Sequence, residues 1–172
     1  MNNNIKEFVE KVQAKFELKG VDYPADLQVS LDFDQRDIHN ALAYIKGAGW
    51  TQMSLLTCVD WIESGEFQLV FILFNWKNGV RVQVRTRIDR DKPIFTTITN
   101  IYPGAQYYER DVHEFFGVEF EGNPDSYKQL FLENWDDIPP MRKDFDAVAY
   151  SDRKYPARKY KADFSTEAGE SK

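Results

Sequence analysis

The chain has 172 residues, enough for one domain with a substantial apolar core, and its acidic residues outnumber the basic ones to give a net charge of −6. That balance argues against a nucleic-acid-binding protein, because such proteins usually carry a basic excess. Aromatic residues make up 15% of the chain, more than one domain of this size usually needs for its own core, so we expect some of them to face a partner.

Apolar residues recur at helical spacing over 4–19, which predicts a first helix. Pro24 indicates a linker after it. Residues 29–33 alternate as a short strand, and a second helix is predicted over 36–47 with Asp34 as its N-cap.

The apolar period then changes from that of a helix to that of a strand. Strands are predicted over 51–60 and 66–75, and the second has a run that is apolar on both faces. That run is far shorter than the ~20 residues needed to cross a bilayer, so we expect no direct membrane span. An Asn-Gly pair at 78–79 indicates a hairpin turn, a returning strand follows over 80–88, and a further extended stretch covers 94–101.

A third helix is predicted over 105–116, where Gly117 ends it. Beyond it the chain has few periodic signals and is rich in Pro, Gly, Asp and Trp. Helices combined with a strand meander predict an α+β fold, a small sandwich of one mainly antiparallel sheet with helices on one side. We therefore divide the chain into an α+β domain, 1–117, and an extended C-terminal arm, 118–172, which we expect to be ordered to about residue 160.

Cysteine and histidine are scarce, which limits the cofactors that the chain can hold. The single cysteine, Cys58, excludes an internal disulfide, an all-cysteine iron–sulfur site and a zinc site built on paired cysteines. The glycine-rich motifs of dinucleotide and P-loop sites are missing as well. We therefore expect no cofactor, no metal and no catalytic residue in this chain.

The densest cluster of ionisable groups lies on the third predicted helix. Glu109 and His113 are i,i+4 neighbours there, and Arg110 and Glu114 form a second such pair. One hypothesis is a free-standing enzyme that uses Glu109, His113 and Glu114 as an acid–base or metal site. The spacing differs from the zinc motif His-Glu-x-x-His and no third ligand is evident, so a charged face or a set of ion pairs at a subunit interface is the better interpretation.

Tyr108, Val112 and Phe115 form an apolar stripe on the same helix. The four ionisable side chains lie largely outside that stripe. If these charges are exposed in the free chain, each pair contributes only about 0–1 kcal/mol to its stability. We therefore expect Glu109→Gln and Arg110→Ala to leave the melting temperature of the isolated chain almost unchanged and to weaken assembly with a partner.

Two segments resemble a known family. Residues 109–125 read Glu-Arg-Asp-Val-His-Glu-Phe-Phe-Gly-Val-Glu-Phe-Glu-Gly-Asn-Pro-Asp, and residues 140–145 read Pro-Met-Arg-Lys-Asp-Phe. Together they resemble the 30-kDa (C-type) subunit family of respiratory complex I, the NADH:quinone oxidoreductase. The family includes the equivalent subunits of membrane-bound energy-converting nickel–iron hydrogenases and ferredoxin-linked relatives. Asp111, Asn123 and Tyr127 depart from the pattern of the complex I branch, which has Glu, His and Arg or Lys there. The loop 135–140 is more similar to the hydrogenase-type relatives.

The resemblance, which covers about residues 29–150, implies a peripheral subunit without a cofactor of its own. It implies that the chain docks on a large subunit similar to the nickel–iron hydrogenase catalytic subunit and that the C-terminal arm wraps this partner. A small iron–sulfur subunit and other subunits of the complex are further implied partners. Iron–sulfur clusters and, in the hydrogenase branch, a nickel–iron centre would lie in those partners. The implied location is the cytoplasmic face of the cell membrane, where the partner subunits hold the chain.

The leading hypothesis is thus a non-catalytic structural subunit of a membrane-bound hydrogenase or ferredoxin-linked ion-pumping complex, and the same subunit of complex I proper is the alternative. Arg142 and Lys143 follow two prolines, which stiffen the chain and present them outward. We expect Arg142, Lys143 and the adjacent Asp144 to dock on a partner or to hold the arm, because arginine pairs with carboxylates in a bidentate geometry that lysine cannot reproduce.

Overall fold

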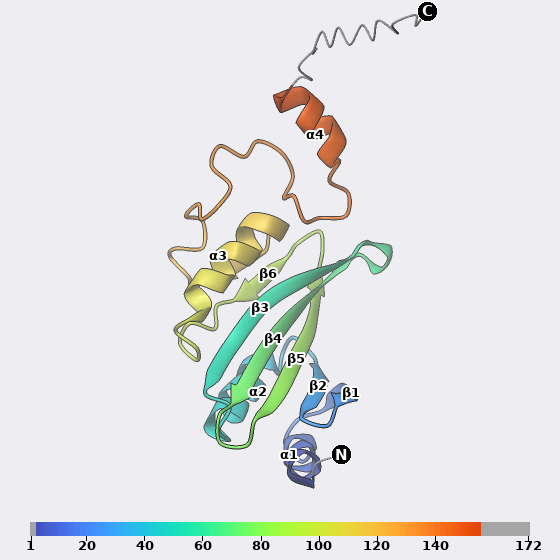
Figure 1. The fold of residues 1–172 in the computed structure, drawn as a ribbon, viewed down its shortest axis with the longest axis vertical. Helices are drawn as coiled ribbons and strands as arrows, with labels where there is room; N and C mark the ends of the chain where they lie inside the picture. Colours follow the sequence, from blue (N-terminus) through green and yellow to red (C-terminus); the bar gives the residue numbers. More distant parts are fainter. Residues whose placement is uncertain (1–2, 156–172) are drawn as a thin grey trace, which may run out of the picture.

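The computed structural model describes residues 3–155, which form one sheet with helices against it and an arm at one end (Figure 1). The helices are α1 (Asn3–Gln13), α2 (Ile38–Gly47), α3 (Ala105–Phe116) and α4 (Ala147–Lys154), with a short 3-10 turn, η1 (Ile62–Ser64). The strands are β1 (Leu18–Ala25), β2 (Gln28–Phe33), β3 (Gln52–Trp61), β4 (Glu66–Asn75), β5 (Val80–Asp89), β6 (Ile94–Thr96) and β7 (Glu119–Glu121).

The main sheet has five strands in the order β1-β2-β5-β4-β3. Three of its four pairings are antiparallel, and β2 and β5 run parallel. The predicted α+β fold with one mainly antiparallel sheet is therefore confirmed. β4 lies inside the sheet, and its apolar run contributes to both faces: Leu69 and Phe71 are fully buried on the inner face, and Val70 is buried on the outer face.

The hydrophobic core lies between the inner face of the sheet and the helices. In Figure 1 α2 lies behind the sheet, and α3 lies beside the upper part of β3. Alternate residues of β5, Val80 to Ile88, are buried on the inner face, whereas the arginines between them are exposed or half-buried on the outer face. The contributions of α1, α2 and α3 to the core include Ile5, Val9, Val12, Ile38, Leu42, Ile45, Val112 and Phe116.

The N-terminal region corrects two predictions. The first helix ends at Gln13 instead of residue 19, and β1 follows, so the segment around Pro24 is an edge strand and no linker. An edge strand tolerates a proline, because the missing N–H faces away from the neighbouring strand. At Gly20 a Cβ would lie 2.6 Å from a carboxylate oxygen of Asp32 in β2, so a larger residue there would require the Asp32 side chain to shift. Asp34 precedes α2 by several residues and is not its N-cap, which is Asp37.

The packed region extends beyond residue 117. The predicted extended stretch 94–101 forms a strand only at β6, which pairs in parallel with β7. Phe95 of β6 and Phe120 of β7 are both buried in the core. A strand of three residues is too short to produce an alternating pattern, so no local signal indicated β7.

The arm begins after β7 and has no regular element over 122–146, after which α4 forms. Asp146 caps this helix by accepting hydrogen bonds from the backbone N–H groups of Val148 and Ala149. None of the helices within residues 3–155 is both long and apolar enough to cross a membrane. The prediction that order ends near residue 160 lies outside the described residues.

Candidate functional site

Glu109, the first residue of the predicted charged cluster, is fully buried and faces the inside of the domain. Its Oε2 accepts hydrogen bonds from Thr97 Oγ1 (2.7 Å) and Asn123 Nδ2 (2.8 Å), and its Oε1 accepts one from the Ile98 N–H (2.8 Å). Glu109 therefore ties α3 to the segments that follow β6 and β7. The expectation of an outward-facing Glu109 is wrong, because a carboxylate with three donors is stable on the buried face of a helix.

Arg110 and Glu114, one turn apart on α3, bind the backbone of the arm. The Arg110 guanidinium donates to the carbonyl oxygens of Lys128 (3.1 Å) and Gln129 (2.7 Å). The Glu114 carboxylate accepts from three consecutive N–H groups, those of residues 130–132, at 2.9–3.0 Å. We call this set of contacts the α3 clamp. Because both ends of the clamp use charged groups, its hydrogen bonds are stronger than those between neutral groups.

His113 lies on the same helix but does not bond to Glu109. Its Nδ1 is 2.9 Å from the Val118 carbonyl oxygen, and its ring contacts the Tyr127 ring edge-on with a centroid distance of 4.9 Å. A carbonyl can only accept, so Nδ1 carries the proton in this contact. The cluster thus separates into one inward carboxylate and three groups that face the arm, and residues 3–155 bring no three metal-ligating side chains into one group.

A second anchor holds the arm to the end of the sheet, and we call it the latch. Arg90, just after β5, forms a bidentate pair with Asp60 of β3, with N–O distances of 2.8 and 3.0 Å. The same guanidinium donates to Asp144 of the arm at 2.7 Å. The backbone N–H of Lys143 donates to Asp60 at 2.8 Å, and Arg142 lies alongside, 3.7 Å from the Asp144 carboxylate. The latch therefore joins a buried ion pair of the domain to three consecutive residues of the arm.

The electrostatics of the latch follow from its burial. Both Asp60 and Arg90 are almost completely buried, whereas Asp144 is about half exposed. Burial raises the pKa of Asp60, but the hydrogen bonds from Arg90 and Lys143 outweigh it, so the net pKa is lowered. The hydrogen bond from Arg90 also lowers the pKa of Asp144. The guanidiniums of Arg90 and Arg142 lie 5.6 and 5.2 Å from the centre of the Phe67 ring.

The sequence indicated one half of the latch and missed the other. Arg142, Lys143 and Asp144 were expected to dock on a partner or to hold the arm, and in the structure they contact the domain. Asp60 and Arg90 stand singly at the ends of two strands and match no motif. The available signal was one charged residue at the end of each of two apolar strands. That pattern does not indicate that the two residues contact each other.

Beyond the α3 clamp the arm packs on itself. Trp135 stacks on Tyr150 of α4 with a centroid distance of 4.3 Å, and Phe145 completes the cluster. Arg153 of α4 pairs with Asp137 at 2.7 Å. These contacts fold α4 back on the loop before it, so the arm has a defined shape of its own.

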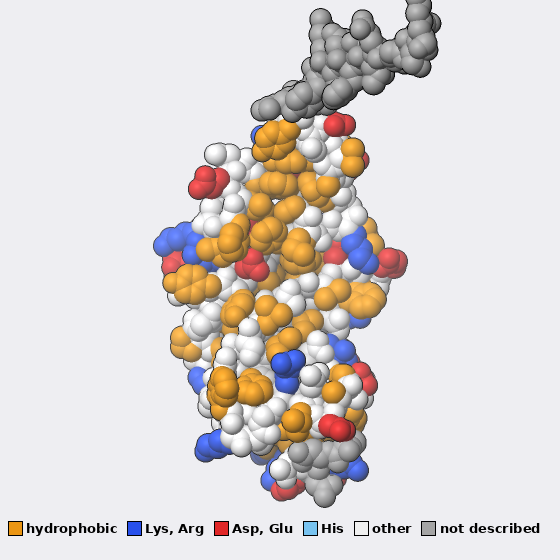
Figure 2. Space-filling model, viewed as in Figure 1, with side chains coloured by type: hydrophobic (Ala, Val, Ile, Leu, Met, Phe, Trp, Pro, Cys, Tyr) orange, Lys and Arg blue, Asp and Glu red, His pale blue; other side chains and the backbone are white. Residues whose placement is uncertain are grey.

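Several large apolar side chains of the arm are exposed. Phe131 is 65% exposed and Met141 is 57% exposed, although the backbone at each position is held by a hydrogen bond to α3. In Figure 2 hydrophobic side chains gather over the upper part of this face, where Figure 1 shows the arm and α4. We call the exposed residues the arm surface; it consists of Tyr127, Phe131, Ile138, Met141 and Val148. A contiguous apolar patch on a protein surface is typical of a site of protein–protein contact.

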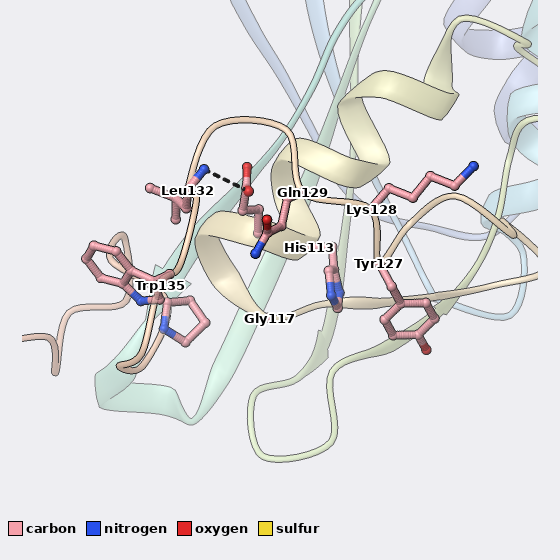
Figure 3. A pocket seen from close by; sticks show the side chains of 9 residues that line it. His113, Gly117, Tyr127, Lys128, Gln129, Leu132 and Trp135 are labelled. Atoms are coloured by element: carbon pink, nitrogen blue, oxygen red, sulfur yellow. Dashed lines mark hydrogen bonds between the residues drawn. The ribbon is translucent and has the colours of Figure 1, made fainter.

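A cavity of about 290 Å³ lies between α3 and the arm (Figure 3). His113 and Tyr127 lie toward one end of it, and Leu132 and Trp135 lie toward the other. Gly117, which ends α3 with a φ of 81°, also lines it. A Cβ at Gly117 would lie 3.2 Å from Pro139 of the arm, so glycine serves both the left-handed backbone and the close approach of the arm.

The comparison with protein families identifies the chain. The model of the respiratory-chain NADH dehydrogenase 30-kDa subunit family matches residues 31–151, which include most of the sheet, both halves of the latch and the α3 clamp. The chain belongs to this family. The resemblance inferred from residues 109–125 and 140–145 is confirmed, and those two segments supply the α3 clamp and the arm half of the latch.

Curated relatives of this 30-kDa-family chain come from bacteria and mitochondria. The NADH-ubiquinone oxidoreductase 30.4 kDa subunit of Neurospora crassa is 34% identical over 123 residues, which are 71% of this chain and 43% of that protein. The C-type subunit of the NADH-quinone oxidoreductase of Rhodobacter capsulatus is 36% identical over 111 residues, 63% of this chain and 54% of that protein. The chain thus spans about half the length of these relatives.

Two solved structures share the fold. A chain of the membrane-bound sulfane sulfur reductase (MBS), an archaeal respiratory membrane complex, superposes with a TM-score of 0.85 at 34% identity, covering 94% of this chain and 98% of that one. The trypsin-resistant fragment of Nqo5 superposes with a TM-score of 0.59 at 23% identity, covering 70% of this chain and 98% of the fragment. At that identity the second match shows the fold alone.

Proposed function

We propose that this 30-kDa-family chain is a non-catalytic structural subunit of a membrane-bound redox complex, and that the arm surface is its main docking site. The observation that carries the proposal is the arm itself. Its backbone is fixed by the α3 clamp and the latch, while Phe131 and Met141 point outward. Stable interfaces need fixed apolar groups in their centre, and a preformed arm avoids the entropy cost of ordering it on binding.

The family supports a role within a complex. The related proteins are named as subunits of NADH-quinone and NADH-ubiquinone oxidoreductases, and the MBS chain belongs to a respiratory membrane complex. We further propose that the complex is of the hydrogenase-type or ferredoxin-linked kind rather than complex I proper. The departures at Asp111 and Asn123 support that choice, and so does the match over 94% of this chain to a chain of the MBS, a respiratory membrane complex named for sulfane sulfur reduction.

The partners that we propose follow from the same family. The arm surface would contact a large subunit similar to the nickel–iron hydrogenase catalytic subunit, near a small iron–sulfur subunit. Iron–sulfur clusters, and a nickel–iron centre in the hydrogenase branch, would lie in those partners. The chain would then stay on the cytoplasmic face of the membrane through its partners.

The test is purification of the tagged chain from detergent-solubilised membranes of its native host. We expect it to elute in a complex with stoichiometric iron–sulfur and membrane subunits, identified by mass spectrometry. A large subunit with paired Cys-x-x-Cys motifs would support the hydrogenase branch, whereas co-purifying NADH-binding subunits would support complex I proper. A stable monomer with its own activity would contradict the proposal and support an enzyme that uses Glu109, His113 and Glu114.

A further inference from the structure

The cavity between α3 and the arm has the size of a side-chain pocket. Its volume of about 290 Å³ is at or below the lower limit of small-molecule sites, which occupy about 300–1,000 Å³. Leu132, Trp135 and Pro139 form apolar walls along the arm. These dimensions suit one large side chain better than a cofactor.

The walls of the cavity are held in place before anything binds. Glu114 accepts the Leu132 N–H at 2.9 Å, the contact drawn as a dashed line in Figure 3. The Trp135 indole donates to the Ile138 carbonyl oxygen at 2.9 Å and stacks on Tyr150. Because these residues are already ordered in the free chain, little of their conformational entropy would be lost when an occupant binds.

The polar groups of the cavity favour a neutral occupant that donates a hydrogen bond. The contact between His113 Nδ1 and the Val118 carbonyl leaves Nε2 of the neutral ring as an acceptor, and Nε2 has no partner among the described residues. The charged groups at the rim already have partners: Lys128 lies 2.5 Å from Asp125, and Glu114 accepts three backbone N–H groups. A charged occupant would have to compete with these contacts, whereas a neutral one would not.

The cavity adjoins the arm surface, since Tyr127 lines the cavity and is itself an exposed member of that surface. Tyrosine and tryptophan are the side chains that most often fill such pockets at the centre of interfaces. We propose that the cavity receives an aromatic side chain with one hydrogen-bond donor, a tryptophan or tyrosine, from the partner subunit, and that this donor bonds to His113 Nε2. The inference rests on the proposed function and adds the residue type that the partner presents.

One test measures the pocket in the free chain by NMR, with N-acetyl-tryptophanamide as the probe. We expect millimolar probe to shift the resonances of His113 and the Trp135 indole. Two controls are N-acetyl-1-methyltryptophanamide, which lacks the N–H donor, and N-acetyl-leucinamide, which lacks the ring. We expect the methylated probe to bind at least three-fold more weakly and the leucine probe not to bind. Equal binding of all three probes, or no shift at the cavity, would overturn the inference.

A second test fills the cavity in the assembled complex. We expect Leu132→Trp to lower the fraction of chain recovered in the complex at least ten-fold. Gln129→Trp, a second variant at a more exposed lining residue, should have the same effect. Leu27→Trp is the control, because Leu27 lies at the exposed turn between β1 and β2, outside the cavity lining and the arm surface, and the larger side chain should be tolerated there. Melting temperatures within about 2 °C of wild type establish that each variant is folded.

The two tests separate failure of the pocket from failure of the proposed function. If wild-type chain does not co-purify with any membrane complex, the proposed function is wrong. If wild-type chain co-purifies and both filled variants assemble equally well, the pocket inference is wrong while the proposed function stands.

Discussion

At the scale of single residues, Glu109 shows how burial reverses an expectation. A Glu109→Gln side chain would keep one acceptor, but its NH₂ group would face a donor in place of the second carboxylate oxygen. We therefore expect a loss of about 1–3 kcal/mol in the free energy of unfolding, which lowers the melting temperature of the isolated chain by several degrees. Glu119→Gln, on the exposed side of β7, is the matched control. A Glu109→Gln melting temperature equal to that of wild type would mean that the three hydrogen bonds contribute nothing.

The latch predicts an order of effects for two aspartates that bind the same arginine. Asp60→Asn should cost more, up to ~3–5 kcal/mol, because the buried Arg90 loses its bidentate partner and keeps only the half-exposed Asp144 as a counter-charge. Asp144→Asn should cost ~1 kcal/mol or less, since Asp144 is half exposed and Arg90 keeps its first partner. Urea unfolding of both variants would measure the difference. Equal losses would contradict the assignment of Asp60 as the buried member.

The same aspartates give the latch a pH dependence. The pKa values of Asp60 and Asp144 are lowered in the folded chain, so the unfolded state binds more protons below its own aspartate pKa of about 3.9. Their contribution to stability is therefore complete above pH ~4 and is lost as the pH falls through the folded-state values. Urea unfolding between pH 6 and pH 3 should show this loss, and Asp60→Asn should reduce its slope. If the unfolding free energy of Asp60→Asn falls with decreasing pH as steeply as that of wild type, other carboxylates cause the acid sensitivity.

At the scale of elements, the α3 clamp predicts how the arm can be released. Glu114→Ala removes the acceptor of three N–H groups, so the amide protons of residues 130–132 should exchange about ten-fold faster, the effect of losing ~1.4 kcal/mol. Glu133→Ala changes an exposed carboxylate in the same segment and should leave the exchange unchanged. Hydrogen-exchange mass spectrometry would measure both variants. Wild-type protection in Glu114→Ala would mean that other contacts hold the arm.

The accuracy of the element predictions depended on how much local signal each segment carries. The third helix and the strand 66–75 were predicted with the bounds that α3 and β4 have, because Gly117 ends the first and the second contains the apolar run 69–74. β1 was missed because a proline and a glycine interrupt it, and β7 because three residues show no period.

The candidate site was predictable only where its residues are neighbours in sequence. Arg110 and Glu114 were singled out on one helix, and Arg142 to Asp144 in one motif. Their partners were not, because the Asp60–Arg90 pair joins two strands across 30 residues of chain, and backbone groups of the arm carry no signature. The assumption that charged residues lie on the outer face of a helix also failed for Glu109, whose donors come from two distant segments.

At the scale of the whole molecule, the motif residues of this family member act first within their own chain. The α3 clamp and the latch use Arg110, Glu114 and the residues around Asp144 to fix the arm, whose apolar side chains Phe131 and Met141 stay exposed. Variants of the anchors should therefore weaken assembly indirectly, by loosening the arm. Variants of the arm surface should weaken it directly, without loss of folding stability.

The most direct measurement is the assembly of a chain whose arm surface has been made charged. Phe131→Glu combined with Met141→Glu should leave the melting temperature of the isolated chain within about 2 °C of wild type, since both side chains are exposed. Leu27→Glu, at the exposed turn between β1 and β2, is the matched control. Quantitative mass spectrometry of the purified membrane complex should show the double variant depleted at least ten-fold and Leu27→Glu at wild-type level. A folded double variant present at wild-type stoichiometry would contradict the assignment of the arm surface as the docking site.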